Sequence, residues 1–137
     1  CIAECGGFLY LHQRLQGQNG AYYPMVGVIP ADAYQTNRLQ QFGYVFMTAK
    51  QDNLLCNKGE KIKAHEFHYW QSQAAGDAFL VEKASGAKRW YSAYATKTLY
   101  AGFPHLYFGG DIALAENFIT GCKQYASKRK IQNHANR

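Results

Sequence analysis

The sequence lacks any long hydrophobic run. No apolar stretch approaches the roughly 18 residues that a membrane-spanning helix needs, and no basic segment followed by an apolar core marks a secretory signal. The four cysteines, Cys1, Cys5, Cys56 and Cys122, show no dense spacing pattern, which favours reduced thiols over a disulfide framework. These absences predict a cytoplasmic protein with no membrane partner.

Two binding motifs are also missing. No G-x-x-x-x-G-K-[ST] segment is present, so the chain encodes no phosphate-binding loop for ATP. No RNA-binding aromatic signature or recognition-helix pattern accompanies the net charge of +6, and we predict no nucleic-acid partner. The basic residues near the C-terminus are interpreted as a solvated tail from about residue 126, the alternative being an arm for an acidic partner. They are Lys123, Lys128, Arg129, Lys130 and Arg137.

The chain does contain enough apolar material for one folded domain. Its 137 residues are 47% hydrophobic and 15% aromatic, and this length suits a single small domain. We therefore predict one domain over residues 1–137. The sequence has no initiator methionine and already has strand character at its first residues, so we expect it to be part of a larger domain.

The stretch Ala3–Leu11, A-E-C-G-G-F-L-Y-L, combines a short strand, a cysteine on a glycine turn and the beginning of an amphipathic helix. In such a nucleophile elbow the thiol projects from the turn and the next N–H can donate to an oxyanion. Cys5 is therefore a candidate nucleophile and Gly6 a candidate oxyanion-hole donor. Gly6 and Gly7 make the turn sterically accessible, and the helix N-terminus favours a thiolate. The alternative is an inert, buried Cys5.

Periodicity and turn residues predict the remaining elements. The first helix is expected to run from the elbow to Gly17, with His12 on its surface. Strands are predicted over residues 22–29, 35–48, 61–70, 78–82, 89–95 and 98–103, with a break at 30–33 and a bend at Gly43. A last helix is expected after Asp111 as N-cap, with an apolar face of Ile112, Ala115, Phe118, Ile119 and Cys122. This order predicts an α/β fold with helices covering a sheet.

The most suitable base for a cysteine nucleophile is His105. It follows an apolar strand and Pro104, at the carboxyl end where open α/β sheets bind their ligands. Cys5 follows the end of a strand in the same way, so we predict that Cys5 and His105 form a nucleophile and base pair. His68 is interpreted as a buried, hydrogen-bonded histidine beside the site.

A metal site built from Cys1, Cys5, His65 and His68 is an alternative use of these residues. Residues 65 and 68 fall within a predicted strand, where side chains three positions apart point to opposite faces. We therefore predict no metal.

Five segments, in order, resemble the C-terminal glutamine amidotransferase domain of cobyrinic acid a,c-diamide synthase. They are residues 3–11, 25–30, 38–44, 65–69 and 100–108. The resemblance extends to about residue 120. It implies a class I glutamine amidotransferase-like, flavodoxin-like sheet flanked by helices, truncated at its N-terminus.

The resemblance also implies roles for particular residues. Cys5 would attack the side-chain amide of glutamine, His105 would raise its nucleophilicity, and Gly6 would donate to the oxyanion. Three consecutive residues would help to hold glutamine: His68, Tyr69 and Trp70.

Two positions depart from the family pattern. Tyr107 stands where full-triad amidotransferases carry a glutamate two residues after the histidine, so another group must orient His105. Glu66 and Asp111 are candidates that the sequence does not rank. Trp70 stands where the family has a small residue, which predicts a reshaped pocket rim.

The implied reaction is hydrolysis of glutamine through a thioester, with ammonia passing to an N-terminal synthetase domain. That domain would use ATP and Mg²⁺ to amidate the a- and c-acetates of cobyrinic acid, a tetrapyrrole polycarboxylate, in cobalamin biosynthesis, and this chain would need no cofactor. Alternatives are another tetrapyrrole acceptor, such as nickel-sirohydrochlorin, and a non-catalytic docking module. An isolated fragment is expected to hydrolyse little glutamine, because losing one oxyanion donor costs about 10²–10³ in rate. Exposed sheet edges would favour homo-oligomers.

Overall fold

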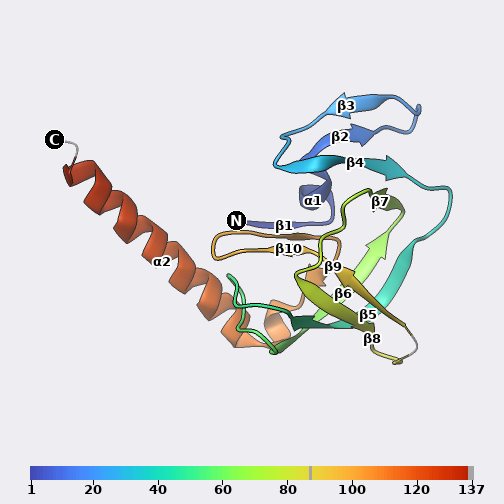
Figure 1. Ribbon diagram of the computed structural model, residues 1–137. Helices are drawn as coiled ribbons and strands as arrows, with labels where there is room; N and C mark the ends of the chain where they lie inside the picture. The colour runs from blue at the N-terminus through green and yellow to red at the C-terminus, as the bar shows by residue number, and fades with distance from the viewer. Residues whose placement is uncertain (87, 136–137) are drawn as a thin grey trace.

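The computed structural model describes residues 1–86 and 88–135 (Figure 1). Its strands are β1 (Ile2–Glu4), β2 (His12–Gln16), β3 (Tyr22–Pro24), β4 (Ile29–Gln35), β5 (Gln41–Ala49), β6 (Lys61–His68), β7 (Trp70–Ser72), β8 (Phe79–Lys83), β9 (Arg89–Ser92), β10 (Tyr94–Ala95), β11 (Tyr100–Gly102) and β12 (His105–Leu106). Its helices are α1 (Gly6–Tyr10), a 3₁₀ turn (Phe108–Gly110) and α2 (Ile112–Ala135).

The strands of the described residues form three sheets. A small sheet has the order β1-β11-β10, in which β1 and β11 are parallel. An antiparallel sheet has the order β12-β6-β5-β8-β9, and a mixed sheet has the order β3-β2-β4-β7. The predicted α/β class is confirmed, although strands greatly outnumber helices.

Two hydrophobic clusters hold these sheets together. One is centred on the five-stranded sheet and includes Met47, Phe79 and Tyr100, all without solvent exposure. The other lies around α1 and includes Phe8 and Phe103. Because Tyr100 and Phe103 lie at the two ends of one short segment, β11 and the residues after it run between the two clusters.

The first helix is shorter than its spacing predicted. α1 ends at Tyr10, and the chain continues as β2, which pairs with both β3 and β4. The apolar spacing that suggested a longer helix is overridden by these backbone pairings. His12 is consequently not a surface residue: it is fully buried, with Nδ1 2.9 Å from the Phe8 carbonyl oxygen and Nε2 2.6 Å from Ser72 Oγ.

The predicted break at residues 30–33 is also wrong. These residues belong to β4, and the strand predicted over 22–29 is reduced to the three residues of β3. Pro30 has no N–H to donate to a neighbouring strand. It fits within β4 because the β2–β4 register is irregular at this position, so no ladder hydrogen bond there requires that donor. Asp32 is tolerated near the core because Arg14 Nε donates to it at 3.0 Å.

The later strands match their predicted positions more closely. Residues 61–70, 78–82, 89–95 and 98–103 contain β6 through β11, except that β7 extends into the predicted loop to Ser72 and β8 extends to Lys83. The strand predicted over 35–48 begins only at Gln41, and Gly43 lies inside it with φ +112° while the pairing with β6 continues through that position in unbroken register. Three of these strands, β6, β8 and β9, belong to one antiparallel sheet, in which the alternation of side chains along a strand predicts it well.

The last helix begins as predicted but buries a different face. Asp111 Oδ1 accepts the Ala113 N–H at 3.0 Å, and Leu114 and Phe118 pack against the core, whereas Ile112, Ile119 and Cys122 are exposed. The helix begins beside the sheets and then extends away from them (Figure 1).

The predicted tail from about residue 126 continues as helix to Ala135, with Lys123, Lys128 and Arg129 exposed. The side chain of Lys130 and all of Arg137 lie outside the described residues. No helix in the described part of the chain is long and apolar enough to cross a membrane.

Candidate active site

Cys5 occupies a strained turn between β1 and α1 (Figure 1). Its backbone has φ 46° and ψ −102°, a conformation that non-glycine residues rarely adopt. Backbone strain of this kind is concentrated at functional sites. The strain therefore falls on the cysteine itself, not on Gly6 and Gly7. A Cβ at Gly6 would meet no atom within 4 Å, so the space beside the candidate oxyanion donor is open.

Burial raises the pKa of the half-buried Cys5 thiol. A hydrogen bond from the Gly6 N–H lowers the pKa, and the charge of Glu4 raises it further. The elbow alone therefore does not produce a thiolate, contrary to the expectation from the helix N-terminus. α1 has only five residues, too few for a substantial macrodipole.

The strand that leads to His105 lies directly beside the strand that leads to Cys5. β1 and β11 are parallel, with Glu4 opposite Gly102, and the Cys5 N–H donates to the Gly102 carbonyl at 2.9 Å. The two strands therefore end at the same edge of the small sheet, as their common sequence context predicted. His105 follows three residues later on β12, opposite His65 of β6.

Glu4 is the acidic group that the structure brings to His105. Its Oε2 lies 3.7 Å from His105 Nδ1, and its Oε1 accepts the Leu106 N–H at 2.9 Å. Sequence analysis missed Glu4 because its partners lie about a hundred residues along the chain. Glu4, the residue before Cys5, was interpreted only as part of a strand.

The two acids predicted to orient His105 are used elsewhere. Asp111 caps α2. Glu66 lies on β6 next to His65, so its side chain points to the opposite face from His65 and from the paired His105. Glu66 is almost fully buried, and its Oε2 has no hydrogen-bond partner within the described residues. Neither residue contacts His105 in a described hydrogen bond or ion pair.

Burial raises the pKa of Glu66 from 4.5 to about 7, against the opposing charges of Lys83 and Lys88. Between these two pH values the folded chain holds a proton that the unfolded chain has released, so the free energy of unfolding falls as the pH rises and levels off above about 7. Replacing Glu66 with glutamine is expected to remove this dependence and to raise the free energy of unfolding at alkaline pH by about 1–3 kcal/mol.

Urea unfolding of both proteins on either side of this pH interval tests the prediction. The advantage of the Glu66→Gln variant should appear only on the alkaline side. A constant difference between the two proteins at every pH would contradict a buried, protonated carboxyl at this position.

The three predicted glutamine-binding residues differ in burial: His68 is buried, Trp70 is half-buried and Tyr69 is exposed. The Nδ1–H of His68 donates to the Trp70 carbonyl at 2.7 Å, and the His68 ring stacks on Phe103 at 3.9 Å. Burial lowers the pKa of His68. Its carbonyl accepts the Gln40 N–H, and the Tyr69 carbonyl accepts the Thr36 N–H. These two carbonyls are therefore already engaged within the protein, and their role in binding glutamine stays a prediction.

Trp70 lies half-buried, and its indole N–H donates to the Gln16 carbonyl at 3.3 Å. It packs against the cluster around α1. The predicted effect of Trp70 on the pocket rim stays a prediction.

A hollow of about 350 Å³ opens beside His105 on the outer face of the five-stranded sheet. Its lining is largely aromatic, and the residues that border it include Tyr44, Phe46, Lys63, His65 and Tyr107. Tyr44 and Tyr107 are largely exposed. The histidine is therefore accessible from solvent, which a residue that exchanges protons with a substrate requires.

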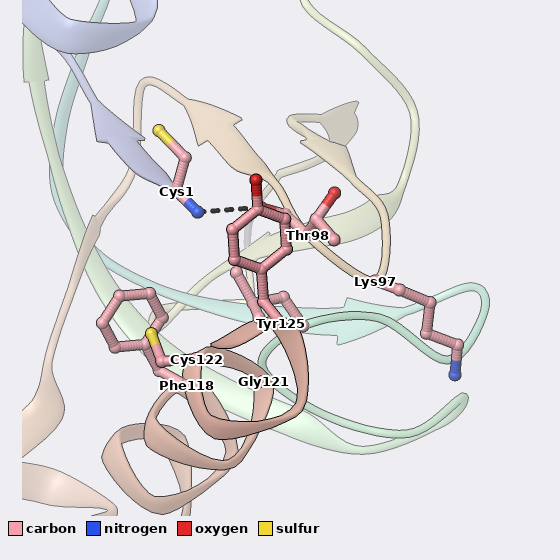
Figure 2. Close-up of a pocket in the computed structure, with 8 residues that line it drawn as sticks. Cys1, Lys97, Thr98, Phe118, Gly121, Cys122 and Tyr125 are labelled. Atoms are coloured by element: carbon pink, nitrogen blue, oxygen red, sulfur yellow. Dashed lines mark hydrogen bonds between the residues drawn. The ribbon is translucent and has the colours of Figure 1, made fainter. Parts of the chain in front are cut away.

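A second hollow, of about 380 Å³, lies between the first residue and α2 (Figure 2). Phe118, Cys122 and Tyr125 line it from the helix, and the Cys1 ammonium donates to the Thr98 carbonyl at 2.7 Å. In the structure all four cysteines are free thiols, and Cys56 is buried. In the described residues no three His, Cys, Asp or Glu side chains gather as metal ligands.

An α/β fold with a cysteine elbow at the end of a parallel strand is the arrangement expected of a class I glutamine amidotransferase domain. Residues 1–112 match the CobB/CobQ-like glutamine amidotransferase domain family. Because this match covers most of the chain, the chain belongs to that family.

Curated relatives agree with the family match. The chain is 37% identical over 126 residues to a cobyrinate a,c-diamide synthase of Synechococcus, covering 90% of this chain and 27% of the relative. It is 33% identical over 128 residues to one from Caldanaerobacter subterraneus, covering 92% and 28%, and 32% identical over 133 residues to one from Thermoplasma volcanium, covering 95% and 29%. The chain therefore spans less than a third of the length of these relatives.

Proposed function

We propose that this chain is the glutaminase part of a glutamine-dependent amide ligase, with Cys5 as nucleophile and His105 as base. The observation that carries the proposal is the strained Cys5 elbow, whose N–H is bonded to the strand that leads to His105. Family membership supports the same chemistry. The raised pKa of Cys5 explains why a base is required.

The reaction begins when Cys5 Sγ gives its proton to His105 and attacks the side-chain amide carbon of glutamine. The Gly6 N–H donates to the oxyanion. His105 then protonates the departing nitrogen, the C–N bond breaks, and ammonia leaves a glutamyl thioester on Cys5. Water that loses a proton to His105 hydrolyses the thioester to glutamate, and the thiol is restored. His68, Tyr69 and Trp70 form the wall beside which glutamine binds.

The ammonia is consumed by a synthetase domain N-terminal to this one, as the greater length of the relatives suggests. By their printed name the relatives are cobyrinate a,c-diamide synthases, so the acceptor proposed here is the pair of a- and c-acetate groups of cobyrinic acid in cobalamin biosynthesis. Activation of those carboxylates by ATP and Mg²⁺ belongs to the synthetase domain, because this sequence has no phosphate-binding glycine loop.

The test is selective labelling of Cys5 by 6-diazo-5-oxo-norleucine, a glutamine analogue whose diazo group leaves as N₂ when a thiol attacks. The 137-residue chain is treated, and its adducts are located by peptide mass spectrometry. We expect one adduct, on Cys5, that glutamine suppresses and glutamate does not.

The exposed Cys1 and Cys122 are built-in controls for this experiment. Iodoacetamide, which has no resemblance to glutamine, should modify these two faster than the half-buried Cys5, because thiolate content and exposure govern such alkylation. A reversal of this preference with the glutamine analogue would demonstrate recognition. No adduct on a folded chain, or adducts spread over the exposed thiols, would favour the alternative of a non-catalytic docking module.

A further inference from the structure

We propose that Glu4 is the positioning residue of this site, holding His105 toward Cys5 and stabilising the imidazolium that forms when His105 takes the thiol proton. The inference rests on the proposed roles of Cys5 and His105. Glu4 would then take the place of the glutamate that full-triad amidotransferases carry where this chain has Tyr107.

Each carboxylate oxygen of Glu4 has a separate partner. Oε1 accepts the Leu106 N–H at 2.9 Å and fixes the backbone next to His105. Oε2 lies 3.7 Å from His105 Nδ1, which is an ion-pair distance and longer than a hydrogen bond. Such contacts shorten when a catalytic site binds its substrate. The carboxylate is therefore placed to attract a positive charge on the ring.

Glu4 also connects the two halves of the site. It immediately precedes Cys5 on β1 of the small sheet, whereas Leu106 immediately follows His105 on β12, the edge of the five-stranded sheet. A single side chain therefore ties the strand of the nucleophile to the strand of the base. A small shift between these strands would change the approach of His105 to the thiol, and such misplacement is costly in catalysis.

The other groups around His105 do not supply this negative charge. Tyr107 packs its ring against the backbone of Gly109 and Gly110. On the outer sheet face the neighbours are His65 and Lys63, which are neutral or positive. Glu4 is partly exposed, with 26% of its side chain accessible.

Two substitutions separate a charge role from a structural role. Glu4→Gln preserves length and an acceptor for the Leu106 N–H but removes the charge. Glu4→Asp preserves the charge but shortens the reach. If Glu4 acts on the imidazolium, alkylation of Cys5 by iodoacetamide near neutral pH should slow about 10-fold in the glutamine variant and less in the aspartate variant. A purely structural role predicts the opposite order.

The slowing of Cys5 alkylation by Glu4→Gln must also depend on the presence of His105. In a His105→Ala background, Glu4→Gln should cause no further slowing, because the imidazole through which Glu4 assists the thiol is gone. The direct effect of the Glu4 charge, which raises the pKa of Cys5, then remains alone, so its removal should leave the rate unchanged or slightly faster. Glu66→Gln is the matched control and should leave the rate at Cys5 unchanged. Circular dichroism verifies that each variant is folded.

Three results would overturn the inference: an unchanged rate in Glu4→Gln, a slower rate in Glu4→Asp than in Glu4→Gln, or full slowing by Glu4→Gln without His105. Iodoacetamide reports only thiolate formation, so these outcomes do not depend on glutamine recognition. Failure of the glutamine analogue to label Cys5 would instead count against the proposed function.

Discussion

Replacing His105 with alanine is expected to slow the labelling of Cys5 by a chloroketone analogue of glutamine by about 10²-fold near neutral pH, the usual size of a general-base contribution. Burial raises the pKa of the Cys5 thiol, so little thiolate exists at neutral pH unless a base accepts its proton. The chloroketone isolates this step, because the thiolate displaces chloride directly and needs no proton donor.

The pH dependence of the same reaction provides a second readout. Hydroxide can replace the missing base as the pH approaches the raised pKa of Cys5, so the deficit of the His105→Ala variant should shrink steadily at alkaline pH. A deficit that is constant with pH would show that the substitution disturbs the site without removing a base.

His65→Ala is the matched control for this experiment. His65 lies opposite His105 in the β6–β12 pairing and borders the same hollow, but no described ion pair joins it to Glu4. Its rate of labelling should stay within about 2-fold of the unsubstituted chain, as is typical of substitutions away from the reacting groups. Equal slowing by both substitutions would contradict a specific role for His105.

The sequence predicted the parts of the site that depend on local pattern. The order strand, cysteine, glycine, helix defined the elbow, and the two strand ends beside Cys5 and His105 do meet as parallel neighbours β1 and β11. The roles of both residues stay predictions. What local pattern could not provide was the contact between Glu4 and the His105 segment, because it depends on how two different sheets meet.

The same reason explains the errors around α1. The spacing of Phe8, Leu11 and Leu15 fits a helix, yet Leu15 lies in β2 because pairing with β3 and β4 satisfies its backbone there. Partners for a backbone N–H or carbonyl are set by tertiary structure, which a periodicity of side chains does not contain. His12 was assigned to the surface for the same reason, although it is buried.

Replacing Phe8 with alanine is expected to lower the free energy of unfolding by about 3–5 kcal/mol, the usual cost of removing a buried aromatic ring. Phe8 has no solvent exposure, and its ring lies 4.6 Å from His12 and 5.0 Å from Phe103. Phe103 in turn stacks on His68. The ring therefore supports the helix after Cys5 and the segment before His105 together.

Urea unfolding monitored by circular dichroism measures this loss, with Phe42→Ala as the control. Phe42 is 62% exposed on the outer face of β5, so its removal should cost less than about 1 kcal/mol. Under conditions in which the Phe8→Ala variant stays folded, the chloroketone should still label Cys5 more slowly. The cavity left by the ring lets α1 and the Phe103 segment shift relative to each other. Unchanged labelling in a destabilised but folded variant would mean that β1 and β11, joined by the Cys5–Gly102 hydrogen bond, hold the site without the packing beneath it.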